Sequence, residues 1–258
     1  MIPKTIHYCW FGGNPLPKLA KRCIKSWKKY CPDYEIIRWD ESNYDISAAP
    51  LYVRQAYEAK KWAFVTDYVR LQVVYDHGGI YLDTDVELLQ NWDHLLESQA
   101  FFGFEDGKYI ATGLGFGAEA GTPIVKEMMD DYQDIPFILD DGSYNAITCP
   151  VRNTAVFLRH GLRQDGESQV IAGCRILPSV CLCPVDYETG KKGRTSETLS
   201  IHHFSASWQS SEQKKRHKRV ARQICRANLI HAIRCTPNRV VRWLLGIERY
   251  ETLKKKLK

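Results

Sequence analysis

The stretch Gly78–Val86, GGIYLDTDV, decides the fold of this chain. Its two glycines end a helical pattern that runs back to Leu51, with one break, and the apolar residues after them are typical of a strand. In a regular strand Tyr81, Asp83 and Asp85 would share one face, and the residues between them would face the core. The sequence therefore predicts helix, double glycine and strand, with two carboxylates presented together.

The spacing of Asp83 and Asp85 favours a cation site. Their Cα atoms would lie about 6.6 Å apart in a strand, so both carboxylates could reach one ion only through a turn or a bridging water. A divalent cation would remove their repulsion and leave positions for phosphate oxygens. We expect one direct and one indirect ligand; a solvated acidic strand end is the alternative.

The rest of the chain indicates an α/β sheet. Residues 2–12 read as a strand, the next helical pattern has an apolar stripe, and residues 34–40 read as a second strand, which is the start of a parallel sheet. Residues 101–121 indicate strands and turns. Two further helices and a late strand are expected at 123–132, 153–162 and 199–208. The stripe consists of Leu19, Cys23, Trp27 and Tyr30.

Composition places the chain among ordinary globular proteins. It has 258 residues, of which 26% are charged and 44% hydrophobic, so disorder is excluded for most of it and one large domain suffices. Its nine cysteines are scattered and show no zinc-binding spacing. Neither a signal peptide nor an apolar run of about 18 residues is present. We therefore expect free thiols and a cytoplasmic location.

The charge is unevenly distributed along the chain. Residues 209–258 carry 15 Lys and Arg against three acids, a net charge of +12, which leaves 21 basic and 27 acidic residues, a net charge of −6, in residues 1–208. We expect a folded domain at 1–208 and a basic helical tail at 209–258. No nucleic-acid motif accompanies this charge, so nucleic acid is not an expected partner.

Apolar residues keep helical spacing among the tail's basic residues, which is typical of a segment that lies on an anionic membrane surface. Each exposed basic residue would contribute about 1 kcal/mol there. A helix packed on the domain with a solvated basic face is the alternative. The apolar positions are Val220, Ile224, Ala227, Ile230 and Ile233.

Two other uses of the aspartates can be weighed on the residues. A helix-loop-helix calcium site needs Gly and Glu at the sixth and twelfth places from Asp83, where Leu88 and His94 stand, so it is excluded. A phosphatase of the haloacid-dehalogenase type fits in part, although Glu87 replaces the Thr or Val of its motif. Its later acidic pair would be Asp140 and Asp141.

Four segments together resemble a known family: IPKTIHYCWFGG, SWKKYCPDYEIIRWD, WAFVTDYVRLQVVYDHGGIYLDTDV and IHHFSASW. They resemble glycosyltransferases with a DXD sugar-binding region (family 32-like), which include fungal initiating mannosyltransferases and bacterial capsular polysaccharide enzymes. The resemblance covers about the first 210 residues. It implies an α/β fold of the GT-A type, with a Rossmann-like nucleotide-binding sheet, and Mn²⁺ or Mg²⁺ holding a nucleotide-sugar diphosphate.

The resemblance also implies roles for the central residues. Asp85 would bind the metal directly, and Asp83 would bind the ribose or a metal-bound water. Tyr81 would lie against the nucleoside, with a core tyrosine as the alternative. Asp67 and Arg70 match a D-x-x-R motif and would hold hydroxyls of the donor sugar, with a surface ion pair as the alternative.

The N-terminal strand would receive the base of the nucleotide. Pro3, His7 and Trp10 are the residues that correspond to it, and Trp10 could stack on uracil or guanine or serve only as core.

The late motif would form the opposite wall of the site. One histidine should complete the metal shell, and the spacing to Trp208 favours His203 over His202. Ser207 and Trp208 would reach the diphosphate. A pair of histidines that merely satisfies buried hydrogen bonds is the alternative.

The chain departs from the family in two places. Phe204 to Ala206 replace small or glycine-rich residues, and residues 147–155, ITCPVRNTA, stand where relatives often have Thr-Gly-Pro.

The function implied is metal-dependent, retaining transfer of a hexosyl group from a nucleotide-diphosphate sugar to a hydroxyl, in polysaccharide or glycolipid synthesis of the capsule or O-antigen kind. UDP is favoured as the nucleotide and a glycan or lipid-linked glycan as the acceptor, on the inner face of the cytoplasmic membrane. A phosphatase that uses Asp83 and Asp85 and a non-catalytic membrane adaptor are the alternatives.

Overall fold

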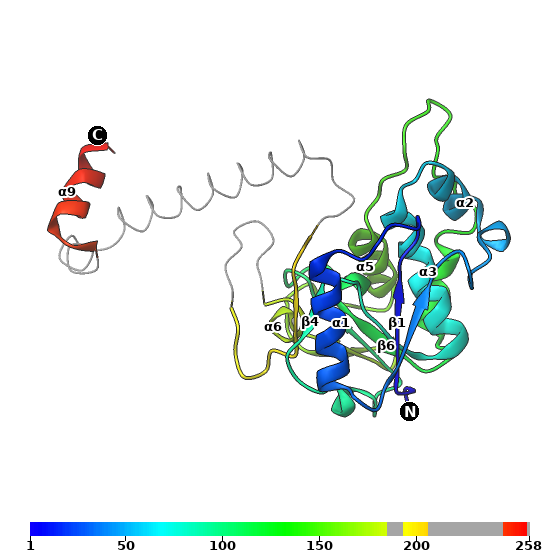
Figure 1. Cartoon of the computed structure of the whole chain (residues 1–258), viewed down its shortest axis with the longest axis horizontal. Helices are drawn as coiled ribbons and strands as arrows, with labels where there is room; N and C mark the ends of the chain where they lie inside the picture. The colour runs from blue at the N-terminus through cyan, green and yellow to red at the C-terminus, as the bar shows by residue number, and fades with distance from the viewer. Residues whose placement is uncertain (185–192, 206–244, 257–258) are drawn as a thin grey trace. The chain divides into compact units, whose positions relative to one another are not determined.

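The computed structural model describes residues 1–184, 193–205 and 245–256 (Figure 1). The first two ranges belong to one compact unit, and residues 245–256 belong to a second. Helix α9 (Ile247–Lys256) is the helix described in the second unit. Ser207, Trp208 and the apolar pattern expected at 220–233 lie outside the described residues.

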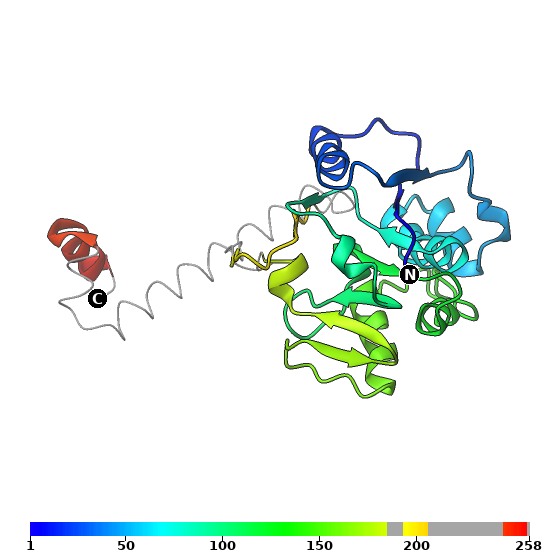
Figure 2. The ribbon, with the colours of Figure 1, turned by 90° about the horizontal axis from the view of Figure 1, so that it is seen from below.

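A seven-stranded sheet forms the centre of the first unit (Figure 2). The strand order is β2-β1-β3-β6-β5-β8-β7. The pairs β1–β2, β1–β3 and β5–β8 are parallel and the other three are antiparallel, so the sheet is mixed. The strands are β1 (Thr5–Cys9), β2 (Glu35–Trp39), β3 (Gly79–Tyr81), β5 (Ala100–Gly103), β6 (Phe116–Ala118), β7 (Gln169–Ile171) and β8 (Cys174–Leu177).

Helices cover both faces of this sheet. On one face four helices pack into a core with Cys9, Tyr81 and Phe116, and on the other the helix α1 packs with Ile6 and Ile80. Alternate residues of one strand therefore enter opposite cores, as a doubly covered sheet requires. The helices are α1 (Lys18–Tyr30), α2 (Leu51–Glu58), α3 (Trp62–His77), α4 (Pro123–Asp130), α5 (Cys149–Arg159) and α6 (Ser179–Leu182).

The expected α/β fold is confirmed in its first half. The stripe predicted for α1 is buried at Cys23 and Trp27. The helical pattern that begins at Leu51 is interrupted at Lys60, because its φ of 56° is incompatible with a right-handed helix. The helix α3 then stops before Gly78, whose φ is 67°.

The strand expected from Ile80 to Val86 is wrong. The strand β3 ends at Tyr81, a turn closes where the backbone N–H of Val86 donates to the carbonyl of Asp83 at 2.9 Å, and β4 (Val86–Leu88) then starts a second sheet. There β4 pairs antiparallel with β9 (Ser200–His202). Short 3₁₀ helices η1 (Ile46–Ala48), η2 (Asp93–Leu95) and η3 (Thr112–Leu114) complete the elements.

None of the helices in the described ranges is long and apolar enough to cross a bilayer.

Candidate active site

The turn between β3 and β4 brings the two aspartates and one histidine together. Ligand atoms of Asp83, Asp85 and His202 all lie within 4.8 Å of one another. The histidine comes from β9, where its residue pairs directly with Val86 in the antiparallel register. Two carboxylates and an imidazole are ligands that Mn²⁺ and similar divalent cations accept. Of the two arrangements that the spacing allowed, a turn or a bridging water, the structure shows a turn.

The Asp85 carboxylate is fixed on both oxygens. His202 Nε2 lies 3.1 Å from Oδ1, and the backbone N–H of Ser205 donates to Oδ2 at 2.7 Å. Phe204, at a φ of 46°, is in the left-handed region that directs this N–H. Burial alone would raise the pKa of Asp85, but His202 and Ser205 outweigh it and hold that pKa well below its usual range. Asp85 is therefore an ionised, oriented carboxylate that could bind a cation.

The surroundings of His202 suit a residue that binds a cation. Burial disfavours its charged form, yet the carboxylates of Asp85 and Asp83 raise its pKa above the ordinary value. Within the described part of the chain its buried Nδ1 has no hydrogen-bond partner. The carboxylates that favour a proton on this ring would equally favour a metal ion beside it, so these three residues fit a divalent cation.

A buried ionic chain extends from Asp83 to α3. Tyr81 Oη donates to Asp83 Oδ1 at 2.9 Å, and Arg70 Nη2 lies 3.5 Å from the same oxygen and 3.0 Å from Asp67 Oδ1. Burial raises the pKa of Asp67 to about 6, against the opposing charge of Arg70. The D-x-x-R pair is thus no surface ion pair. It lies beside the D-x-D aspartate.

The 3₁₀ helix η3 and the start of α5 form a wall in which the sequence analysis assigned no site residue. A Cβ at Gly113 would lie 2.6 Å from Asp83 Oδ2 and 3.0 Å from Arg70 Nη1, so a larger residue there would force one of these side chains to shift. Cys149, Thr112 and Asn153 lie next to them and hydrogen-bond to one another. The glycines of residues 112–117 were the available signal, but nothing local places them beside Asp83.

The assignment of His7 to the base is wrong. Its side chain is completely buried, its Nε2 is 2.9 Å from the Gly78 carbonyl, and Trp39 Nε1 donates to its Nδ1 at 3.1 Å. Burial lowers the pKa of His7 to about 4. The imidazole therefore joins β1, β2 and the start of β3 as a neutral ring.

Pro3 is also misplaced as a base-binding residue. It precedes β1 and packs against Gly78 at the amino end of β3, whereas the aspartates follow the carboxyl end of β3. Because β1 and β3 are parallel, these are opposite edges of the sheet. Trp10 does follow the carboxyl end of β1; it is half-buried and its indole N–H donates to the Asn14 carbonyl at 2.6 Å.

The structure differs from the expectation on which histidine joins the aspartates. His203 Nε2 lies 2.7 Å from Glu87 Oε2, with Arg22 Nη2 3.3 Å from the ring nitrogen. Neighbouring residues leave a strand on opposite sides, so His202 points to Asp85 and His203 points away. The spacing to Trp208 could not reveal which of the two histidines faces Asp85.

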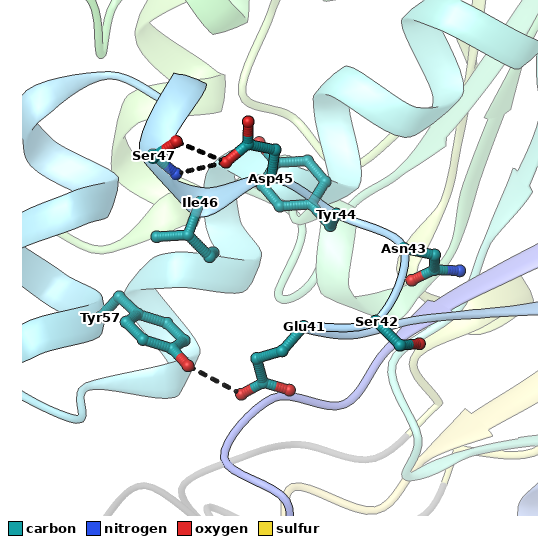
Figure 3. Close-up of a pocket in the computed structure, with 8 residues that line it drawn as sticks. All are labelled: Glu41, Ser42, Asn43, Tyr44, Asp45, Ile46, Ser47 and Tyr57. Atoms are coloured by element: carbon teal, nitrogen blue, oxygen red, sulfur yellow. Dashed lines mark hydrogen bonds between the residues drawn. The ribbon is translucent and has the colours of Figure 1, made fainter.

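A hollow of about 540 Å³ lies at the loop that follows β2 (Figure 3). There Glu41 Oε1 accepts hydrogen bonds from the Gly12 backbone N–H at 2.6 Å and from Tyr57 Oη at 3.1 Å. Glu41 thereby joins the loops that follow β1 and β2. The lining residues are Glu41, Ser42, Asn43, Tyr44, Asp45, Ile46, Ser47 and Tyr57.

Comparison with known proteins agrees with this geometry. Residues 17–102, which contain both the D-x-x-R and the D-x-D, match the model of the glycosyltransferase sugar-binding region containing DXD motif. Over these residues the chain is similar to that family. The mixed sheet with helices on both faces agrees with the α/β fold expected for it.

Two curated proteins are similar to part of the chain. Inositol phosphoceramide mannosyltransferase 3 of Schizosaccharomyces pombe is 36% identical over 104 residues, which are 39% of this chain and 29% of that protein. An uncharacterized glycosyltransferase of Acanthamoeba polyphaga mimivirus is 29% identical over 132 residues, 48% of this chain and 51% of that protein. The chain thus spans about half or less of the length of these relatives.

Among solved structures, the PaToxG glycosyltransferase superposes with a TM-score of 0.47 at 17% identity, over 61% of this chain and 68% of that one.

Proposed function

We propose that the chain is a metal-dependent, retaining glycosyltransferase that moves a hexosyl group from a nucleotide-diphosphate sugar to an acceptor hydroxyl. The observation that carries the proposal is the group of Asp83, Asp85 and His202 directly beside the buried Asp67–Arg70 pair. A cation site next to a polar pair suits a diphosphate joined to a sugar. UDP is the nucleotide we favour.

The position of the group in the sheet supports a nucleotide ligand. Strand β1 pairs in parallel with β2 on one side and with β3 on the other. The next strand in sequence, β2, is therefore added on one side of β1 and β3 on the opposite side, which makes β1 the topological switch point of the sheet. Ligands of open α/β sheets bind at such a point, outside the carboxyl ends of the strands. Asp83 and Trp10 follow those ends. The nucleoside would therefore lie toward the loops joined by Glu41.

The chain's own groups would act on the donor in distinct ways. Asp83, Asp85 and His202 would hold the cation, which when bound would stabilise negative charge on the diphosphate leaving group. Ser205 keeps Asp85 oriented through its N–H. Asp67 would accept, and Arg70 would donate, hydrogen bonds to sugar hydroxyls, a pairing that favours one hydroxyl arrangement over another.

Retention of the anomeric configuration is part of the proposal. The carboxylates of Asp67 and Asp83 both lie against Arg70, which lowers their nucleophilicity and supports front-face attack by the acceptor. Mass spectrometry after incubation with a slow donor analogue tests this. A stable glycosyl-enzyme adduct would overturn front-face attack while leaving the transferase assignment in place.

Donor binding tests the core of the proposal. Thermal-shift measurements with UDP-glucose, UDP-galactose, UDP-N-acetylhexosamines and GDP-mannose, each with and without manganese, should show stabilisation by one donor that depends on manganese. Calorimetry on Asp85→Asn should then show donor and manganese binding weakened at least tenfold. Unchanged affinity in that variant would refute the assignment.

The acceptor and the location are proposed from the tail. Residues 209–258 carry a net charge of +12, and this charge supports attraction to anionic lipid on the cytoplasmic face, with a lipid-linked glycan as acceptor. A chain ending at Ser211 should lose sedimentation with phosphatidylserine vesicles and keep donor binding. Equal sedimentation of both chains would remove the membrane from the proposal.

A further inference from the structure

The sulfur of Cys149 lies at the centre of a ring of hydrogen-bond donors. At the first residue of α5, Sγ is 3.2 Å from Asn153 Nδ2, 3.1 Å from Thr112 Oγ1 and 3.9 Å from Arg70 Nη1. Asn153 Nδ2 in addition donates to Thr112 Oγ1 at 3.0 Å. One thiol therefore connects η3, α5 and α3.

These groups are all shielded from water. Cys149 is 5% exposed, Arg70 4%, Asn153 1% and Thr112 not at all. Burial raises the pKa of the Cys149 thiol to about 12, so the sulfur is a neutral and weak acceptor. Water cannot replace it as a partner for the donors around it, and a residue without an acceptor would leave them unpaired.

The contact with Arg70 matters because the rest of the guanidinium is already held. Nε donates to the Thr66 carbonyl at 2.9 Å, and Nη2 contacts Asp67, Asp83 and Thr66 Oγ1. Nη1 faces η3, where Gly113 leaves it room. In the part of the chain that the structure describes, the hydrogen bond recorded for Nη1 is the one to Cys149 Sγ.

We propose that Cys149 is a positioning residue for Arg70. Its sulfur orients Nη1 toward η3 through one weak hydrogen bond, and it also connects η3 to α5. Because that bond uses one N–H of Nη1, the other N–H is left to donate to a hydroxyl of the donor sugar. The inference rests on the proposed function and deepens it, because it places the wall that reads the sugar at Thr112, Cys149 and Asn153.

A pair of substitutions separates positioning from packing. Cys149→Ser keeps a polar acceptor in a smaller side chain, whereas Cys149→Val fills the space and removes the acceptor. The measurement is the ratio of two dissociation constants, obtained by calorimetry with manganese: that of the nucleoside diphosphate and that of its sugar conjugate. UDP with the tightest UDP-sugar of the panel is the probe, or GDP with GDP-mannose if that binds tightest.

We expect Cys149→Val to lower this ratio about tenfold, equivalent to about 1.4 kcal/mol, because sugar binding falls while nucleotide binding stays. Cys149→Ser should keep the ratio within about threefold of the wild type. Cys174→Val is the matched control: this cysteine is equally buried, and its recorded hydrogen bond is to the Ala172 carbonyl. It should leave the ratio unchanged.

The outcomes distinguish the two levels of the argument. Suppose that the wild type prefers a sugar conjugate, that Cys149→Val retains the wild-type ratio and that Cys149→Ser loses it. The side chain of Cys149 then acts by packing, so the inference is wrong while the proposed function stands. If both variants retain the wild-type ratio, the inference also falls. If the wild type binds no nucleotide or conjugate, the proposed function is wrong and the inference fails with it.

Discussion

Acid should destabilise this fold through His7, a residue outside the proposed chemistry. The neutral ring accepts from Trp39 and lies 2.9 Å from the Gly78 carbonyl, so a second proton on the ring would face the Trp39 N–H. The pKa of His7 falls from 6.5 to about 4 on folding. Between these values the unfolded chain binds more protons, so stability falls as pH falls.

The size of the effect follows from the two pKa values. Linkage gives a loss of about 2 kcal/mol between pH 7 and pH 5 and about 3 kcal/mol by pH 4, all of it present above pH 6.5. Because His7 is completely buried, solvent screening reduces this little. Asp67 acts in the opposite sense: its pKa of about 6 in the fold makes it favour the folded state more as pH falls.

Urea unfolding at pH 8, 7, 6 and 5 measures this dependence, and His7→Gln isolates it. The variant starts less stable but should lose about 2 kcal/mol less than the wild type between pH 7 and pH 5. His94→Gln, at an exposed histidine, should follow the wild type. If the curves for His7→Gln and the wild type stay parallel over this range, the neutral buried imidazole is not the source of the acid sensitivity.

Three further predictions concern the site. His202→Gln should weaken manganese binding about 10- to 100-fold and its neighbour's variant His203→Gln less than threefold, by calorimetry; the reverse order would restore His203 to the metal shell. Gly113→Ala should lower donor affinity at least tenfold, because its Cβ would displace Asp83 or Arg70, while the melting temperature falls by only a few degrees. Unchanged donor binding would place the sugar elsewhere. Arg70→Lys should reduce donor affinity even though the charge is kept, since one ammonium nitrogen cannot take the places of the three guanidinium nitrogens that contact Thr66, Asp67 and Cys149. An Arg70→Lys variant with wild-type affinity would show that charge alone suffices.

Local pattern predicted a large part of the framework correctly. The helix, double glycine and strand around Gly78 follow from periodicity and from the conformational freedom of glycine, which need no distant partner. The family and the D-x-D with its D-x-x-R also follow from short, ordered motifs. The turn between Asp83 and Val86 was one of two ways the spacing allowed both carboxylates to reach one ion, but the sequence analysis predicted a continuous strand there.

Long-range pairing decided the remainder. Which histidine meets Asp85 depends on the register of β4 with β9, a pairing across more than a hundred residues that fixes strand parity. His7 proved structural because the parallel arrangement of three strands buries it.

The sequence by itself therefore determined the elements up to β3, their order and the acids that follow β3, since these depend on neighbours a few residues apart. Only the tertiary structure decided that η3 and Cys149 stand against Arg70, 79 residues from that thiol along the chain. No local sequence pattern predicts the contact between Cys149 and Arg70, because it is created by the packing of α5 on η3.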